Sequence, residues 1–116
     1  RERLRSAMHA VSQHERGLAT HFYEALTRLQ GVHVYGPDFQ ERRAPTVSFT
    51  IDGRTPSAIA GRLAEQGILV WDGDFYAARA VDLLGLSMRG GLVRVGISLY
   101  TTREEVDQLI NALSSL

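Results

Sequence analysis

The segment over residues 91–105 constrains the fold most, because a clear strand pattern runs directly into a clear helix start. Apolar residues alternate along its first part, as in a half-buried strand, at Val93, Val95, Ile97 and Leu99. Thr102 then precedes Glu105 by three positions, which is the spacing of a capping box. We therefore expect a strand with one face against the core, followed at once by a helix over residues 103–113.

The opposite face of this strand carries a single charge, Arg94, together with Leu92, Gly96, Ser98 and Tyr100. Because Gly96 and Ser98 are small, they leave room for a flat group beside the guanidinium. One interpretation is an arginine that binds a carboxylate through two parallel hydrogen bonds. The other is an exposed arginine that pairs with a nearby acid or lies over apolar surface. The spacing alone leaves both interpretations open.

Turn residues divide the rest of the chain into further elements. The patterns predict helices over 1–29, 56–66 and 75–84, and strands over 32–35, 45–51 and 68–71. The resulting order, αββαβαβα, predicts an α/β chain of the α+β two-layer type. In this architecture helices cover a small, mostly antiparallel four-strand sheet.

The run over residues 68–71 is continuously apolar, so we expect this strand to be covered on both faces. Trp71 at its end and Tyr76 in the next helix are either an aromatic wall near Arg94 or core residues. Between them, residues 72–74 predict a plain turn, because a calcium loop needs about twelve residues.

Composition excludes several function classes. The 116 residues suffice for one domain, and the net charge of +0 provides no basic field for nucleic acid or an anionic membrane. The sequence contains no cysteine, which excludes thiol chemistry by these residues and favours a reducing, cytoplasmic setting. All 13 basic residues are arginines, so a reaction through a lysine cannot be completed by these residues alone.

The histidines do not form a metal-binding pattern. His9, His14 and His21 lie five and seven residues apart, whereas imidazoles on one helix face meet at three or four. We expect them on a solvated face of the first helix, and we expect no metal site.

Four segments together resemble the C-terminal part of class V aminotransferases, the cysteine desulfurase-like enzymes. Residues 93–107 are similar to the closing motif of this family, in which an arginine is followed by a Tyr-Asn-Thr sequence and an acidic helix start. Residues 67–73 resemble its Gly-Ile-x-Val segment, and residues 32–37 and 43–49 fit the preceding strands. The resemblance implies the small domain of a fold-type I enzyme that uses pyridoxal 5'-phosphate.

The resemblance also implies roles for individual residues. Arg94 would bind the α-carboxylate of an amino-acid substrate, and a loop with Trp71, Asp72, Asp74 and Tyr76 would lie at the active-site mouth. The cofactor and its lysine would belong mainly to a large domain missing from this chain, in a parent enzyme expected to be a homodimer. Within the single domain over 1–116, residues 1–30 would be the helix connecting to that large domain and 31–116 the small C-terminal domain. These 116 residues alone would not be catalytic.

Two departures from the family pattern limit this interpretation. Desulfurases carry a persulfide-forming cysteine where this chain has residues 74–77, and Thr101 replaces the asparagine of the closing motif. The first departure argues against sulfur transfer by that route. The alternative is a stand-alone, non-catalytic module that binds a small carboxylate or mediates assembly. Neither the amino acid nor the type of reaction is indicated.

Overall fold

The computed structural model describes residues 1–75 and 78–116, which form an α+β domain. Its four strands build one antiparallel sheet, which confirms the expected small four-strand sheet, and their order in it is β1-β2-β4-β3. The elements in chain order are α1 (Glu2–Thr27), β1 (Val32–Tyr35), β2 (Thr46–Ile51), α2 (Pro56–Ala64), β3 (Trp71–Gly73), α3 (Ala78–Leu83), a 3₁₀ helix (Ser87–Arg89), β4 (Leu92–Gly96) and α4 (Arg103–Ser114).

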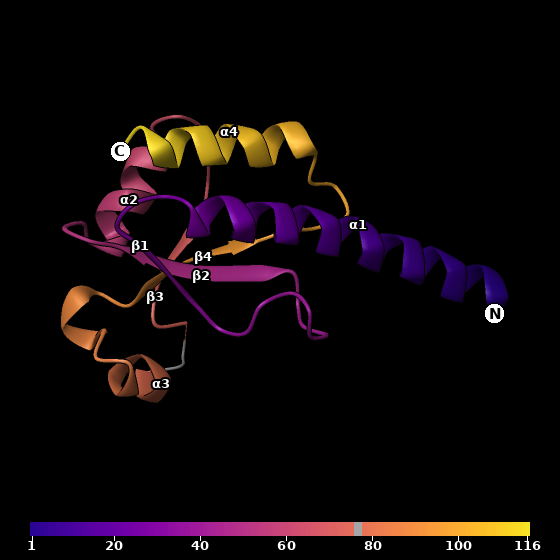
Figure 1. Ribbon diagram of the computed structural model, residues 1–116, viewed down its shortest axis with the longest axis horizontal. Coiled ribbons are helices and arrows are strands. Elements are labelled where there is room, and N and C mark those ends of the chain that lie inside the picture. Colours follow the sequence, from indigo (N-terminus) through magenta and orange to yellow (C-terminus); the bar gives the residue numbers. More distant parts are fainter. Residues whose placement is uncertain (76–77) are drawn as a thin grey trace.

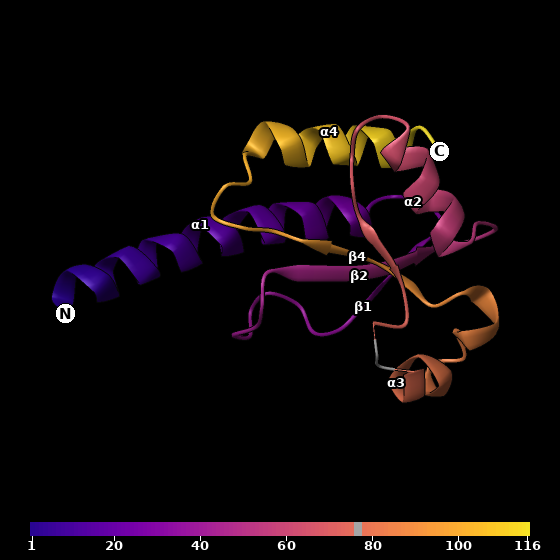
Figure 2. The same ribbon diagram turned by 180° about the vertical axis from the view of Figure 1, so that it is seen from behind.

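The helices cover the two faces of the sheet unequally. α1, α2 and α4 lie on one side, and the short α3 and the 3₁₀ helix lie on the other (Figure 1); the view from behind shows the same layers (Figure 2). The main core fills the space under the three longer helices. Phe22 of α1 meets Phe49 of β2 there edge to face, with ring centroids 6.3 Å apart. Further core residues are Leu18, Leu26, Val47, Ile59, Leu63, Val93, Val95, Val106, Leu109 and Leu113.

Only the second half of α1 contributes to this core. The sequence predicted a helix over 1–29, but two of its apolar residues, Leu4 and Met8, are 67% and 62% exposed. The reason is geometric, because the first half of the helix extends beyond the sheet (Figure 1). Leu18, Phe22 and Leu26 are buried where α1 crosses the strands.

Two of the predicted helix starts, at residues 56 and 103, are confirmed. The Thr102 side chain accepts a hydrogen bond from the Glu105 backbone N–H, and the Glu105 side chain accepts one from the Thr102 backbone N–H, which completes the capping box. At α2, the Thr55 side chain accepts a hydrogen bond from the Ala58 N–H, and Pro56 occupies the first helical turn.

The strand predicted over 68–71 is wrong in position and in burial. β3 begins only at Trp71, and it is an edge strand that pairs with β4 alone. Leu69 is therefore 86% exposed and Trp71 74% exposed, so Trp71 is not a core residue. Asp72 and Gly73, expected in a turn, lie within β3.

Two further boundaries differ from the prediction. The helix expected over 75–84 is α3, which spans only Ala78–Leu83, and Tyr76 lies outside the described residues. β4 ends at Gly96, because residues 98–101 form a turn in which the Thr101 N–H donates to the Ser98 carbonyl at 3.0 Å. Leu99 is consequently 49% exposed and does not face the core.

Two of the three histidines of α1, His14 and His21, do more than face solvent. The His14 ring contacts the Thr101 carbonyl oxygen at 2.8 Å, and the His21 ring contacts the Asp107 carboxylate at 2.7 Å. These contacts join α1 to α4 and to the turn before it. Within the part of the chain that the structure describes, no helix is both long and apolar enough to cross a membrane.

Candidate functional site

Arg94 lies in the middle of β4 on the face of the sheet opposite the three longer helices. It is paired across the strands with Ser48 of β2 and Trp71 of β3, and Ser48 is paired in turn with Tyr35 of β1. Cross-strand partners leave a sheet on the same side, so these four side chains form one row. The Arg94 side chain is exposed, as the alternation of β4 predicted.

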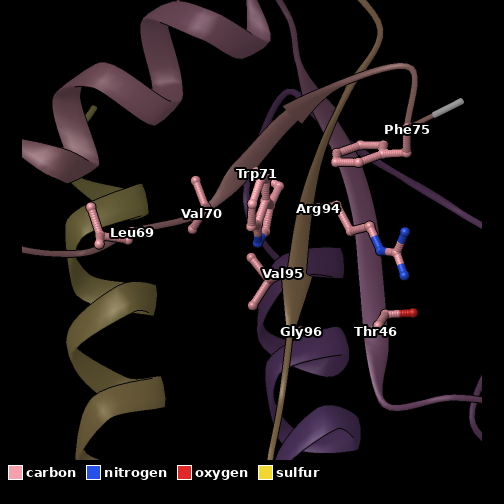
Figure 3. A pocket seen from close by; sticks show the side chains of 8 residues that line it. All are labelled: Thr46, Leu69, Val70, Trp71, Phe75, Arg94, Val95 and Gly96. Carbon is pink, nitrogen blue, oxygen red and sulfur yellow. The ribbon is translucent and has the colours of Figure 1, made fainter.

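A pocket of about 500 Å³ opens beside this row. It is lined by Thr46, Leu69, Val70, Trp71, Phe75, Arg94, Val95 and Gly96. Arg94 is the only charged residue of this lining, which is otherwise mostly apolar. In Figure 3 the guanidinium extends toward Thr46 and lies below the Phe75 ring, while the Trp71 indole stands on the other side of β4.

The Arg94 guanidinium lies over an aromatic ring. Its central carbon lies 5.4 Å from the centroid of Phe75, within the range of a cation–π interaction. Across residues 1–75 and 78–116, no hydrogen bond or ion pair engages its N–H groups. Arg43 is different, since it donates to the carbonyl oxygens of Pro37 and Thr46. The Arg94 N–H donors therefore remain available for an external acceptor, and a carboxylate matches their geometry.

Phe75 reaches Arg94 through an unusual backbone conformation. Its φ is +54°, and it is the one non-glycine residue with a positive φ in the described part of the chain. Its ring also packs against a second small cluster on this side of the sheet, formed by Val81, Leu86 and Leu92. The ring is thus held between this cluster and the guanidinium.

A close approach between two glycines fixes the position of the segment that leads to Phe75. Gly91, just before β4, is buried with a φ of +86°, and a Cβ there would collide with the carbonyl group of Gly73 in β3. Only a residue without a side chain permits this approach. This close approach fixes the end of β3, two residues before Phe75, against the start of β4.

The structure brings together only some of the residues expected at the site. Trp71 and Arg94 are direct neighbours, but Trp71 belongs to a strand and not to a loop. Asp72 is paired with Val93 and so leaves from the other face of the sheet. Asp74 is exposed and follows β3, and Tyr76 lies outside the described residues.

Sequence reasoning missed Phe75 as a site residue and assigned it to a helix. The one sequence feature that could have indicated Phe75 is its position as an aromatic residue directly after the polar segment over 72–74. Among the described residues, no group of three or more His, Asp or Glu side chains is placed to hold a metal ion.

Comparisons with known proteins identify relatives of this domain. A probable cysteine desulfurase of Staphylococcus epidermidis is 33% identical over 104 residues, which are 90% of this chain and 24% of the relative. The apo cysteine desulfurase of Thermococcus onnurineus NA1 superposes with a TM-score of 0.83 at 28% identity, over 90% of this chain and 25% of that one. A C-DES mutant with glycine covalently linked to its PLP cofactor has a TM-score of 0.65 at 23% identity, over 90% of this chain and 23% of that one.

The fold is thus the α+β fold that is also found in a quarter of the cysteine desulfurase of Thermococcus onnurineus NA1. The model of the aminotransferase class-V family matches residues 4–109, and the chain belongs to this family. It spans about a quarter of the length of the curated relatives that it matches.

Proposed function

We propose that this domain forms part of the substrate site of a pyridoxal-phosphate enzyme and that Arg94 binds the α-carboxylate of an amino acid. The proposal rests on the surroundings of the Arg94 guanidinium. It is exposed in a pocket, and across the described ranges 1–75 and 78–116 no carboxylate neutralises it. An exposed arginine without a carboxylate partner is well suited to bind an anionic ligand.

The residues of this chain fit the substrate side of such a site and not the covalent attachment of the cofactor. Bound pyridoxal phosphate supplies an electron sink for amino-acid chemistry. The lysine that attaches it must come from elsewhere, because the sequence contains none. A fold neighbour with glycine linked to PLP supports this choice of cofactor.

The proposal extends to a longer parent protein. Residues 1–30 would connect to a large domain that holds the cofactor, and residues 31–116 would be the small C-terminal domain. The exposed first half of α1 agrees with such a connection. We further expect the parent enzyme to be a cytoplasmic homodimer, and these 116 residues to have no catalytic activity by themselves.

The neighbours of Arg94 would shape the mouth of the site. Trp71 would provide an apolar wall beside the substrate, and Asp74 would lie in the loop at the entrance. The sequence contains no cysteine, so none of these residues can carry sulfur as a persulfide. The relatives are named cysteine desulfurases, and this chain would have to reach the same outcome by a different group.

The test is the substitution Arg94→Ala in the full-length parent enzyme. Losing a charge-assisted pair of hydrogen bonds should raise KM for amino acids by roughly 10- to 100-fold. The absorbance of the bound cofactor should stay unchanged, because Arg94 is proposed to contact substrate only. Arg62→Ala, at an exposed arginine of α2, is the matched control and should leave KM unchanged.

An unchanged KM in Arg94→Ala would contradict the proposal. A parent protein that binds small carboxylates through Arg94 but holds no pyridoxal phosphate would favour the non-catalytic module instead.

A further inference from the structure

We propose that Phe75 is a positioning residue, which holds the Arg94 guanidinium in the orientation that receives a carboxylate. This inference rests on the proposed function of Arg94 and adds a residue that sequence patterns did not single out. It draws on three observations, which are the ring contact, the backbone conformation of Phe75 and the packing behind its ring.

The contact leaves the binding edge of the guanidinium open. The Phe75 ring centroid lies 5.4 Å from the central guanidinium carbon, and the ring stands over the group in Figure 3. A cation–π contact uses the delocalised charge of the guanidinium and consumes none of its N–H donors. A carboxylate accepts hydrogen bonds from those N–H groups in the guanidinium plane. Both contacts can therefore exist together, whereas an acidic partner would compete with the substrate.

The conformation of Phe75 is maintained by its surroundings. A bulky residue with a φ of +54° is strained, and such strain persists only where the surrounding structure fixes it. The packing against Val81, Leu86 and Leu92 supplies that restraint. Strained residues gather at ligand sites, and this one contacts the single charged residue of the pocket lining.

The alternative is that Phe75 only fills space on the second cluster. Phe75→Leu separates the two roles, because leucine keeps an apolar side chain next to the cluster but has no aromatic face for the guanidinium. Like phenylalanine, leucine is not β-branched, so the positive φ at this position should strain the two residues to a similar extent. Phe75→Tyr keeps the aromatic face and is the conservative rescue.

The experiment uses the full-length parent enzyme and an amino-acid substrate. We expect Phe75→Leu to raise KM by roughly three- to tenfold and to change kcat by less than about twofold, since the cation–π contact orders the binding group. Phe75→Tyr should restore KM. The thermal midpoint of each variant is measured in parallel, and Phe75→Met replaces Phe75→Leu if leucine lowers that midpoint.

A double-mutant cycle with Arg94 distinguishes the two proposals. In the Arg94→Ala enzyme, Phe75→Leu should have no further effect on KM, because the group that it positions is gone. An equal rise in KM with and without Arg94 would overturn the role of Phe75. An unchanged KM in Phe75→Leu, beside a raised KM in Arg94→Ala, would also overturn it and leave the proposed function intact. An unchanged KM in Arg94→Ala would overturn both.

Discussion

Trp71 and Arg94 are direct cross-strand partners on β3 and β4, so the indole and the guanidinium leave the same face of the sheet. The pair combines an exposed apolar surface with a charge that has no acidic partner among residues 1–75 and 78–116. An amino acid bound through its carboxylate at Arg94 would thus lie next to Trp71. This placement makes Trp71 a natural reporter of binding.

We predict that the fluorescence of Trp71 changes when a carboxylate ligand binds. Trp71 is the only tryptophan of the sequence and is 74% exposed, so its environment becomes less polar when a ligand covers it. The measurement is the difference in emission between the parent enzyme and its Trp71→Phe variant during titration with substrate. The change should vanish in Arg94→Ala, and its persistence there would contradict the shared site.

Replacement of Trp71 should affect binding more than stability. Trp71→Ala removes an exposed side chain, so we expect the free energy of unfolding to change by no more than about 0.5 kcal/mol. KM should rise by roughly two- to tenfold through the loss of aromatic contact with the substrate. Urea denaturation and steady-state kinetics measure the two effects, and a large loss of stability with an unchanged KM would refute the prediction.

The capping box at the start of α4 should contribute measurably to stability. Thr102→Ala removes the side-chain acceptor for the Glu105 N–H, which we expect to lower the free energy of unfolding by about 1 kcal/mol. Thr27→Ala is the matched control, because the Thr27 hydroxyl donates only to the Glu24 carbonyl at an exposed helix end. Equal losses in urea denaturation would show that the cap itself adds nothing.

Breaking the contact between Phe22 and Phe49 should lower the free energy of unfolding more than removing the cap at Thr102. Phe22 is fully buried, so Phe22→Ala removes the aromatic contact and leaves a cavity. We expect a loss of about 3–5 kcal/mol in the free energy of unfolding. Leu83→Ala, at a side chain that is 79% exposed, should cost no more than about 0.5 kcal/mol. A loss below about 1 kcal/mol for Phe22→Ala would show that this core is not well packed.

The fold was predictable from the sequence where local patterns coincide with tertiary contacts. The alternation at Val93 and Val95 and the cap at Thr102 depend on neighbouring residues, and the structure retains both. The position of β3 depends instead on pairing with β4, which a continuously apolar run does not reveal. The same limit applies to α1, because periodicity alone does not show where a helix leaves the sheet.

The site was predictable only in part, for a related reason. The period of two along β4 places Arg94 on the open face, and this face is the observed one. Phe75 reaches the guanidinium through a left-handed conformation and through packing on Leu86 and Leu92, which are distant in sequence. No local pattern encodes that arrangement, so Phe75 was assigned to a helix.

Gly91, where the backbone passes close to Gly73, should be the backbone position of the site that tolerates substitution least. Alanine at Gly91 meets two penalties, which are a φ of +86° and a collision with the Gly73 carbonyl group. Gly53→Ala is the matched control, because Gly53 has a φ of +73° but no heavy atom within 4 Å of the point that a Cβ would occupy. We expect Gly53→Ala to cost about 1 kcal/mol in the free energy of unfolding.

Gly91→Ala should cost at least about 2 kcal/mol more than Gly53→Ala, because β3 must move away from β4 to admit the methyl group. That movement would carry Phe75 away from Arg94, so KM for amino acids should rise as well. Urea denaturation of both variants isolates the collision from the backbone strain that they share. Equal losses of stability would mean that β3 yields easily, and the positioning of Phe75 would then have to come from the Val81, Leu86 and Leu92 cluster alone.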